Sequence, residues 1–283
     1  MRILRATHLG MCFGVRDAIA LAKEQSAAEP LTVLGDLVHN ETVLADLRSR
    51  GIRFERDAAQ VTTPTVMITA HGASDASMER VRVRGLNVVE ATCPLVHHAH
   101  RELRRLVDEG FHPVIIGQAS HVEVRGMTED LAEYDVVLTP VEVGQLSWRR
   151  RFGVVAQTTQ PIARVRELVA LLQRRFPDSE VRFVDTVCQP TKQRQSAAEE
   201  IARRCDVVVV IGGANSNNTR ELVATCQARC ARVYHVQGPD DVRAEWFEGV
   251  HVTGITAGTS TPDAVIDQVE ARVKALAERQ AAA

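Results

Sequence analysis

The sequence lacks an excess of basic residues, an apolar run long enough to span a membrane and any two cysteines in a CxxC spacing. A formal net charge of -2 argues against a nucleic-acid partner, which would need a basic surface. The first residues contain no uninterrupted apolar region of the signal-peptide type, and no stretch approaches the roughly 18 apolar residues of a membrane span. We therefore expect a cytoplasmic globular protein with no membrane and no nucleic-acid partner.

Two further absences narrow the class of protein. Neither GxGxxG nor GxxxxGK[ST] follows an apolar run, which disfavours a nucleotide-binding α/β protein with a zinc site. The missing CxxC spacing argues against a ferredoxin or a zinc ribbon. In a reducing cytoplasm, the six cysteines of this 283-residue chain are better explained as ligands, nucleophiles or small buried side chains than as disulfides.

Three of the cysteines, Cys12, Cys93 and Cys188, occur in similar local settings. Each precedes a stretch with apolar residues at helical spacing, and each helix is followed by an apolar run typical of a strand buried in a parallel sheet. The predicted helices cover residues 16–25, 97–109 and 192–204. The predicted strands cover residues 31–35, 113–117 and 207–212.

A polar residue follows each of these strands at a nearly constant distance from the cysteine. The spacing is 27 positions from Cys12 to His39, 28 from Cys93 to His121 and 28 from Cys188 to Ser216. A second helix and a further strand with a polar end complete each unit. Because ligands bind beyond the carboxyl ends of parallel strands, each unit offers one cysteine and two polar loops to a shared centre.

This register predicts an α/β fold of three similar units with parallel sheets, arranged around a pseudo-threefold axis in a trefoil-like manner. The predicted units are residues 14–93, residues 94–187, and residues 188–283 completed by residues 1–13. The three cysteines would meet at the centre.

Three convergent thiolates are suited to a 4Fe-4S cluster. They hold three of the four irons and leave one open to a substrate, whereas four thiolates favour simple electron transfer. We therefore predict Cys12, Cys93 and Cys188 as cluster ligands in a catalytic site. Any one of them alone is more often a small buried side chain than a ligand.

The other cysteines are Cys205, Cys226 and Cys230, for which we expect buried packing. A metal pair formed by Cys226 and Cys230 is the alternative, but no matching second pair is visible in the sequence.

Polar residues gather around the three predicted ligands. Histidines, hydroxyls, amides and helix N-termini together can bind a diphosphate without a large excess of positive charge. Singly, each histidine could be a surface or core residue, and residues 215–218 could be a helix cap. The collected residues are His39, Asn40, His71, His121, Glu123, Gln157, Thr158, Thr159, residues 215–218, Ser260 and Asp263.

Across almost the whole chain, ordered motifs resemble the 4-hydroxy-3-methylbut-2-enyl diphosphate reductase family of the non-mevalonate isoprenoid pathway. The matching segments are GMCFGV from position 10, VHN from 38, AHG from 70, ATCPLV from 91, HxE from 121, QTT from 157, Cys188 with Thr191, Arg194 and Gln195, NSxN from 215 and AGxSxPD from 257.

The resemblance implies a role for each matched residue. Cys12, Cys93 and Cys188 would hold the cluster, and Glu123 would donate the proton, with His121 and Thr158 completing the catalytic group. Thr158 would orient the substrate hydroxyl or a water. The residues implied in substrate binding are His39, His71, His121, Thr158, Ser216, Asn217, Asn218 and Ser260.

The family chemistry implies reduction of the allylic diphosphate to isopentenyl and dimethylallyl diphosphate, with electrons from a ferredoxin or flavodoxin. The alternative is a non-catalytic iron-sulfur sensor or diphosphate-binding paralogue of the same fold. A sensor would have no need of a proton donor beside an open iron, so His121, Glu123 and Thr158 favour the reductase.

Four positions depart from the commonest family pattern. They are Ser120, Pro190, Ala214 and Asn217, where glycine, alanine, lysine and serine are usual. Asn217 can still donate hydrogen bonds. Loss of a lysine at Ala214 would remove a long-range attraction for the diphosphate, so we expect an effect on affinity or substrate choice.

Overall fold

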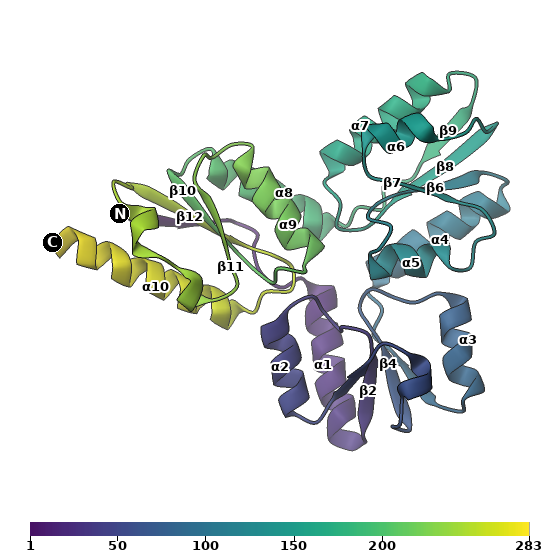
Figure 1. Cartoon of the computed structure of the whole chain (residues 1–283), viewed down its shortest axis with the longest axis horizontal. Helices are drawn as coiled ribbons and strands as arrows, with labels where there is room; N and C mark the ends of the chain where they lie inside the picture. The colour runs from purple at the N-terminus through teal and green to yellow at the C-terminus, as the bar shows by residue number, and fades with distance from the viewer. Residues whose placement is uncertain (283) are drawn as a thin grey trace. The chain divides into compact units, whose positions relative to one another are not determined.

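The computed structural model describes residues 1–282, with side chains as far as Glu278. It contains three sheets of four strands each, and every pair of neighbouring strands is parallel (Figure 1). This confirms the α/β class with three parallel sheets, while the pseudo-threefold arrangement stays a prediction. Among residues 1–282, no helix combines the length and apolar character needed to cross a membrane.

The first sheet joins the N-terminus to the last third of the chain. Its strands, in spatial order, are β1 (Arg2–Arg5), β12 (Val252–Ala257), β10 (Val207–Ile211) and β11 (Val233–Val236). The helices of this part are α8 (Gln189–Ala202), α9 (Asn217–Gln227) and α10 (Asp263–Ala282), with short 3-10 turns η2 (Pro239–Asp241) and η3 (Ala244–Phe247).

The central strand β10 shows why its apolar run folds into a parallel sheet. Val207, Val209 and Ile211 join a cluster with side chains of α10. Val208 and Val210, on the opposite face, pack with side chains of α8 and α9. A strand covered by helices on both faces needs apolar residues at every position.

The second sheet follows the first cysteine. Its strands, in spatial order, are β3 (Arg53–Glu55), β2 (Leu31–Leu34), β4 (Thr65–Ile68) and β5 (Asn87–Glu90). The helices are α1 (Phe13–Ala28), α2 (Glu41–Ser49) and α3 (Asp75–Val83), with a 3-10 turn η1 (Ala58–Gln60).

The third sheet follows the second cysteine. Its strands, in spatial order, are β7 (Asp135–Val137), β6 (His112–Ile116), β8 (Arg151–Ala156) and β9 (Glu180–Phe183). The helices are α4 (Pro94–Asp108), α5 (Val122–Thr128), α6 (Pro140–Gln145) and α7 (Ile162–Arg175). Apolar clusters fill both faces of this sheet, one around Phe152 and one around Ile115.

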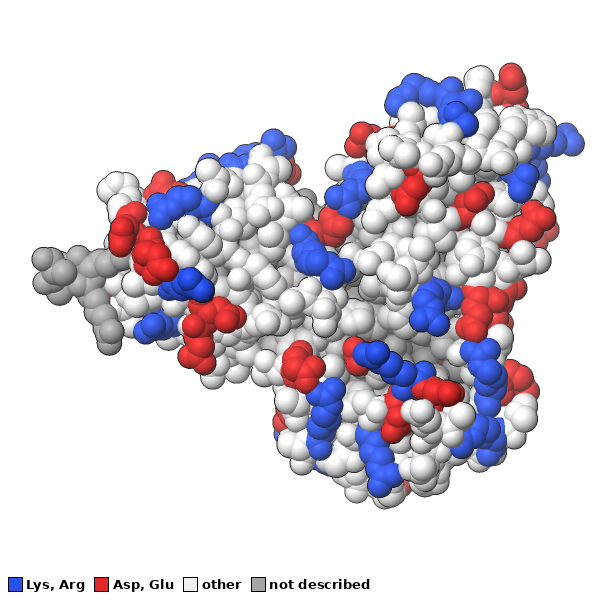
Figure 2. All heavy atoms as spheres, in the orientation of Figure 1, with Lys and Arg blue, Asp and Glu red and all other residues white. Residues whose placement is uncertain are grey.

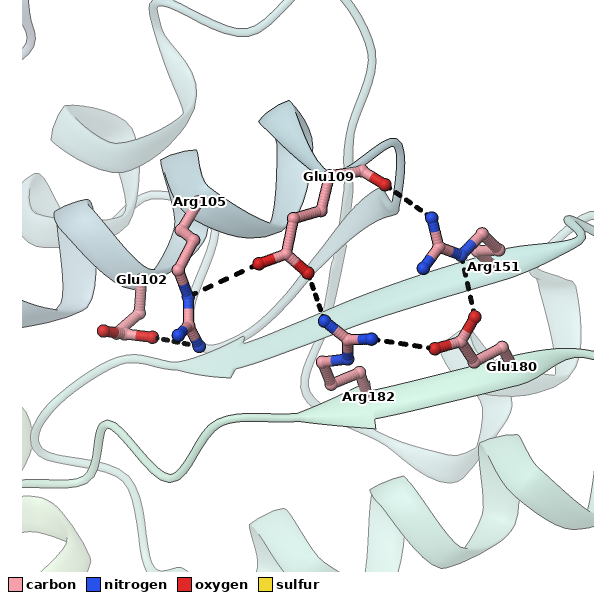
Figure 3. Close-up of polar contacts among 6 residues, drawn as sticks. All are labelled: Glu102, Arg105, Glu109, Arg151, Glu180 and Arg182. Atoms are coloured by element: carbon pink, nitrogen blue, oxygen red, sulfur yellow. Dashed lines mark hydrogen bonds and ion pairs between the residues drawn. The ribbon is translucent and has the colours of Figure 1, made fainter.

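Charged side chains cover the edge strand β9 of the third sheet. Arg182 on β9 pairs with Glu109 at the end of α4, and Arg151 on β8 pairs with Glu180 at 2.8 Å (Figure 3). Arg151 also lies over the ring of Phe111, 3.8 Å from its centroid. Exposed pairs of this kind contribute little stability each, but charge on an edge strand discourages pairing with another chain.

The chain divides into two compact units. Unit 1 comprises residues 1–16, 39–45 and 189–283, and unit 2 comprises residues 17–38 and 46–188. Unit 1 contains the first sheet, and unit 2 contains the other two. The finer division at residues 93 and 187 stays a prediction. Positive and negative side chains are interspersed over the face shown in Figure 2, in keeping with the small net charge.

Candidate active site

A buried carboxyl is the central feature of unit 2. Glu123, on the first turn of α5, is only 1% exposed. Its two carboxyl oxygens accept hydrogen bonds from the Thr158 N–H at 2.6 Å and from the Thr158 hydroxyl at 2.9 Å. Burial raises the pKa of Glu123 from 4.5 to about 7, and the two bonds from Thr158 oppose this shift only in part. Near neutral pH, Glu123 can therefore hold a proton and give it up.

Two histidines, His71 and His121, lie close to each other at the start of α5. His121 caps α5, and its Nδ1 accepts a hydrogen bond from the Glu123 N–H at 3.2 Å. A neutral imidazole that accepts at Nδ1 carries its proton on Nε2 and can donate from there. The rings of His71 and His121 meet edge to face with centroids 5.6 Å apart. His71 from the loop after β4, Glu123 and His121 at the start of α5, and Thr158 from the loop after β8 therefore form one cluster of polar side chains.

The raised pKa of Glu123 predicts a pH dependence of stability. The carboxyl has a pKa of about 7 in the folded chain and 4.5 ordinarily. As the pH rises, it therefore loses its proton at a lower pH in the unfolded chain than in the folded one. This contribution to stability is complete below pH 4.5 and is lost as the pH rises through 7. Between pH 5 and 8 we expect the free energy of unfolding to fall by about 2 kcal/mol more in the wild type than in E123Q. Chemical denaturation of both proteins across this range measures the difference, and parallel curves would contradict the assigned pKa.

The two cysteines of unit 2 are tied by their backbones to the same loops. The Cys93 N–H donates to the carbonyl of Ala70 at 3.1 Å, next to His71. The Cys188 N–H donates to the carbonyl of Thr158 at 3.0 Å. Both thiols are partly buried, and each cysteine directly precedes a helix. Because a helix N-terminus favours negative charge, these positions suit a thiolate ligand.

Unit 1 places Cys12 in a comparable setting. Cys12 precedes α1, is partly buried and donates its N–H to the carbonyl of Thr259 at 3.1 Å. The buried Arg194 on α8 donates from Nε to the carbonyl of Gly10 at 2.9 Å, which holds the Cys12 loop against that helix. The Cys12 loop and the loop after β12 are therefore joined.

The His39 loop belongs to the same unit. The Ser260 hydroxyl donates to the carbonyl of His39 at 3.3 Å. A Cβ added at Gly213 would lie 2.3 Å from that carbonyl oxygen. Only glycine at this position allows the loop after β10 to approach the His39 backbone so closely.

Three predicted binding residues lie at the start of α9. Ser216 caps the helix, with its hydroxyl accepting from the Thr219 N–H at 3.3 Å. Asn217 and Asn218 are buried in the first turn, and the Asn218 Oδ1 accepts from the Thr259 N–H at 3.0 Å. The Asn218 Nδ2 is a buried donor with no hydrogen-bond partner within residues 1–282. A buried amide donor at a helix N-terminus is suited to an anionic oxygen.

The remaining cysteines differ from the predicted ligands. Cys205, Cys226 and Cys230 belong to the apolar cluster beneath α8 and α9. Burial raises the pKa of Cys226 to about 12 and that of Cys205 to about 11. The Cys230 Sγ lies 3.5 Å from the carbonyl oxygen of Cys205. A thiol with a raised pKa is a poor ligand. The expected buried packing is confirmed for Cys226 and Cys230, whereas Cys205 is only partly buried.

The four departures from the family pattern fit the local structure. Pro190 is the second residue of α8, where a missing N–H costs nothing, and its carbonyl accepts from Arg194. The Ser120 hydroxyl accepts from the Gln118 amide at 3.1 Å. The Ala214 N–H donates to Gln237 at 3.2 Å, and Asn217 is buried. Their effect on affinity or substrate choice stays a prediction.

The structure brings the predicted site residues into two groups. Glu123, Thr158, His121 and His71 form one group in unit 2, and Cys12, His39, Ser260 and Asn218 are linked in unit 1. Their roles stay predictions. Sequence reasoning missed Gly213 and Thr259, because a close backbone approach and backbone hydrogen bonds leave no side-chain signal.

Known proteins resemble this chain over nearly its full length. A family model described as LytB protein matches residues 3–274. The 4-hydroxy-3-methylbut-2-enyl diphosphate reductase of Geobacter sulfurreducens is 37% identical over 277 residues, covering 97% of each chain. The one of Trichlorobacter lovleyi is 36% identical over 275 residues, covering 96% of this chain and 98% of the relative.

Two solved structures also match. The E-1-hydroxy-2-methyl-but-2-enyl-4-diphosphate reductase of Plasmodium falciparum gives a TM-score of 0.90 at 27% identity, covering 95% of this chain and 87% of that one. A solved (E)-4-hydroxy-3-methyl-but-2-enyl diphosphate reductase, described as the terminal enzyme of the non-mevalonate pathway, gives a TM-score of 0.69 at 34% identity. The alignment covers 97% of this chain and 100% of that one.

Proposed function

The chain belongs to the LytB family, and we propose that it reduces (E)-4-hydroxy-3-methylbut-2-enyl diphosphate to isopentenyl and dimethylallyl diphosphate. The reaction takes two electrons and two protons, releases the hydroxyl as water and forms a new C–H bond at one end or the other of the allyl group, which gives the two products. The observation that carries the proposal is the buried Glu123, whose carboxyl is held by Thr158 and whose pKa is about 7.

Glu123 meets the main chemical requirement of this reaction. An allylic hydroxyl is a poor leaving group unless it is protonated as it departs, and a positioned acid with a pKa near the working pH is the most effective donor. The Thr158 hydroxyl, 2.9 Å from the carboxyl, can pass a proton between Glu123 and the substrate oxygen. His121 fixes the first turn of α5 through its bond to the Glu123 N–H.

The residues also fit a 4Fe-4S cluster. Cys12, Cys93 and Cys188 are partly buried and each directly precedes a helix, whereas the other cysteines lie in an apolar cluster. When bound by three thiolates, such a cluster supplies electrons and one open iron that acts as a Lewis acid toward the hydroxyl.

The substrate diphosphate would be bound by neutral donors and a helix N-terminus. The buried Asn218 Nδ2 and the N-terminus of α9 supply donors in unit 1, and His71 and His121 supply imidazoles in unit 2. Each would contribute a hydrogen bond to a phosphate oxygen without a large charge excess. We propose a ferredoxin or flavodoxin in the cytoplasm as the electron donor.

Anaerobic turnover tests the proposal. Protein reconstituted with iron and sulfide should consume the hydroxymethylbutenyl diphosphate with a strong reductant and release the two five-carbon diphosphates. Other allylic diphosphates that lack the terminal hydroxyl should not react. Iron-loaded protein that binds the substrate without turnover would instead favour a non-catalytic sensor or paralogue, for which a buried acid of raised pKa has no use.

A further inference from the structure

Unit 2 contains a pocket, partly lined by arginines, that shares no residue with the candidate active site. The pocket has a volume of about 410 Å³ and lies at the carboxyl end of the second sheet, next to the last residue of β2 and the segment after β3. It is lined by Leu34, Arg56, Asp57, Ala58, Ala59, Ser77, Arg80 and Arg84. Parallel sheets bind ligands beyond this end of their strands.

Three arginines give the pocket its charge. Arg56 follows β3, and its side chain has no hydrogen bond or ion pair to any residue from 1 to 282. Arg84 follows α3, and its guanidinium donates to the carbonyl of Val61 at 3.0 Å. Arg80 on α3 pairs with Glu129 at 2.7 Å and also donates to the Ser77 hydroxyl. Asp57 is the one acid in the lining, and its carboxylate accepts from the Ala59 N–H.

Three apolar residues contribute to the rest of the lining, namely Leu34, Ala58 and Ala59. A guanidinium can donate two parallel hydrogen bonds to two oxygens of a phosphate, and apolar lining residues add affinity for a hydrocarbon part. The volume lies within the range of small-molecule sites. We propose that this pocket binds a small phosphate ester, with Arg56 and Arg84 on the phosphate and Leu34 against the hydrocarbon.

Glu129 is the internal competitor for such a ligand. It pairs with Arg80 and also accepts a hydrogen bond from the Ser74 hydroxyl at the cap of α3. A phosphate that recruits Arg80 must release it from Glu129. Replacing Glu129 with Gln should therefore strengthen binding more than E79Q does, because Glu79 lies on the same helix outside the pocket and pairs only distantly with Arg82.

Calorimetric titration of the cluster-loaded protein with butyl phosphate, and separately with inorganic phosphate, tests the proposal. We expect one saturable site that binds butyl phosphate more tightly than inorganic phosphate. R56Q/R84Q should weaken butyl phosphate binding at least about tenfold. R53Q/R82Q removes the same charge from neighbouring positions outside the pocket and should leave binding within about twofold.

The single variant R56Q keeps the test informative if R56Q/R84Q does not fold. It should fold normally, because the Arg56 side chain makes no polar contact in the described part of the chain. It should still weaken binding severalfold. Turnover of the proposed substrate should stay unchanged in R56Q, so the outcome does not depend on the proposed reaction. Equal weakening in R53Q/R82Q, unchanged binding in R56Q/R84Q, or no saturable binding would each overturn the proposal.

Discussion

Replacing Glu123 with Gln should lower kcat by roughly 10² to 10⁴-fold while leaving substrate affinity nearly unchanged. Glutamine has the same shape and can still accept the Thr158 N–H, but it cannot donate a proton to a departing hydroxyl. The loss should therefore appear in the chemical step. Steady-state kinetics with a strong reductant, together with calorimetric binding of the substrate, separate the two quantities.

The pH profile gives this prediction a second readout. With a pKa of about 7 in the substrate-free protein, Glu123 loses its proton as the pH rises, so kcat/KM of the wild type should decline above neutrality. The residual rate of E123Q should lack that decline. E133Q removes an exposed carboxylate from the same unit and should behave as wild type. Undiminished turnover in E123Q would show that another group donates the proton.

Replacing Cys12, Cys93 or Cys188 with Ser should remove most of the bound iron and nearly all turnover. An alcohol is a far poorer cluster ligand than a thiolate, and two remaining thiolates would hold the cubane weakly. Iron and sulfide analysis after anaerobic reconstitution measures the effect. The wild type should bind about four irons per chain.

The control for this series is C205A. Cys205 is also partly buried, but burial raises the pKa of its thiol to about 11, so it should not contribute to the cluster. C205A should retain iron and turnover. If C205A lost as much iron as C93S, the assignment of the ligands would be wrong.

Local pattern was sufficient for the buried strands β2, β6 and β10 and for the helices that follow the cysteines, but it did not indicate the edge strands β3, β5, β7, β9 and β11. The apolar run at residues 207–212 predicted β10, which ends one residue earlier, at Ile211. Predicted helix starts were late by about three residues. The helix α4 begins at Pro94, because proline at the first helical position loses no hydrogen bond, whereas apolar periodicity becomes visible only later.

Contacts between distant residues could not be predicted in the same way. The sequence pattern pointed to Glu123 and Thr158 separately, but their hydrogen bonds, and the burial that raises the pKa of Glu123, depend on how α5 packs beside the loop after β8. The pocket of Arg56 and Arg84 has no sequence signal either. Its arginines come from segments that only the second sheet brings together.

Mössbauer spectroscopy of the iron-57 protein tests the central claim most directly, because the account requires a cluster with three thiolate-bound irons and one open iron that receives the substrate hydroxyl. The spectrum should show one iron distinct from three. Adding the hydroxymethylbutenyl diphosphate to E123Q, which should bind the substrate without turning it over, should shift the signal of that one iron alone. Four equivalent irons, or a spectrum that the substrate leaves unchanged, would contradict the account.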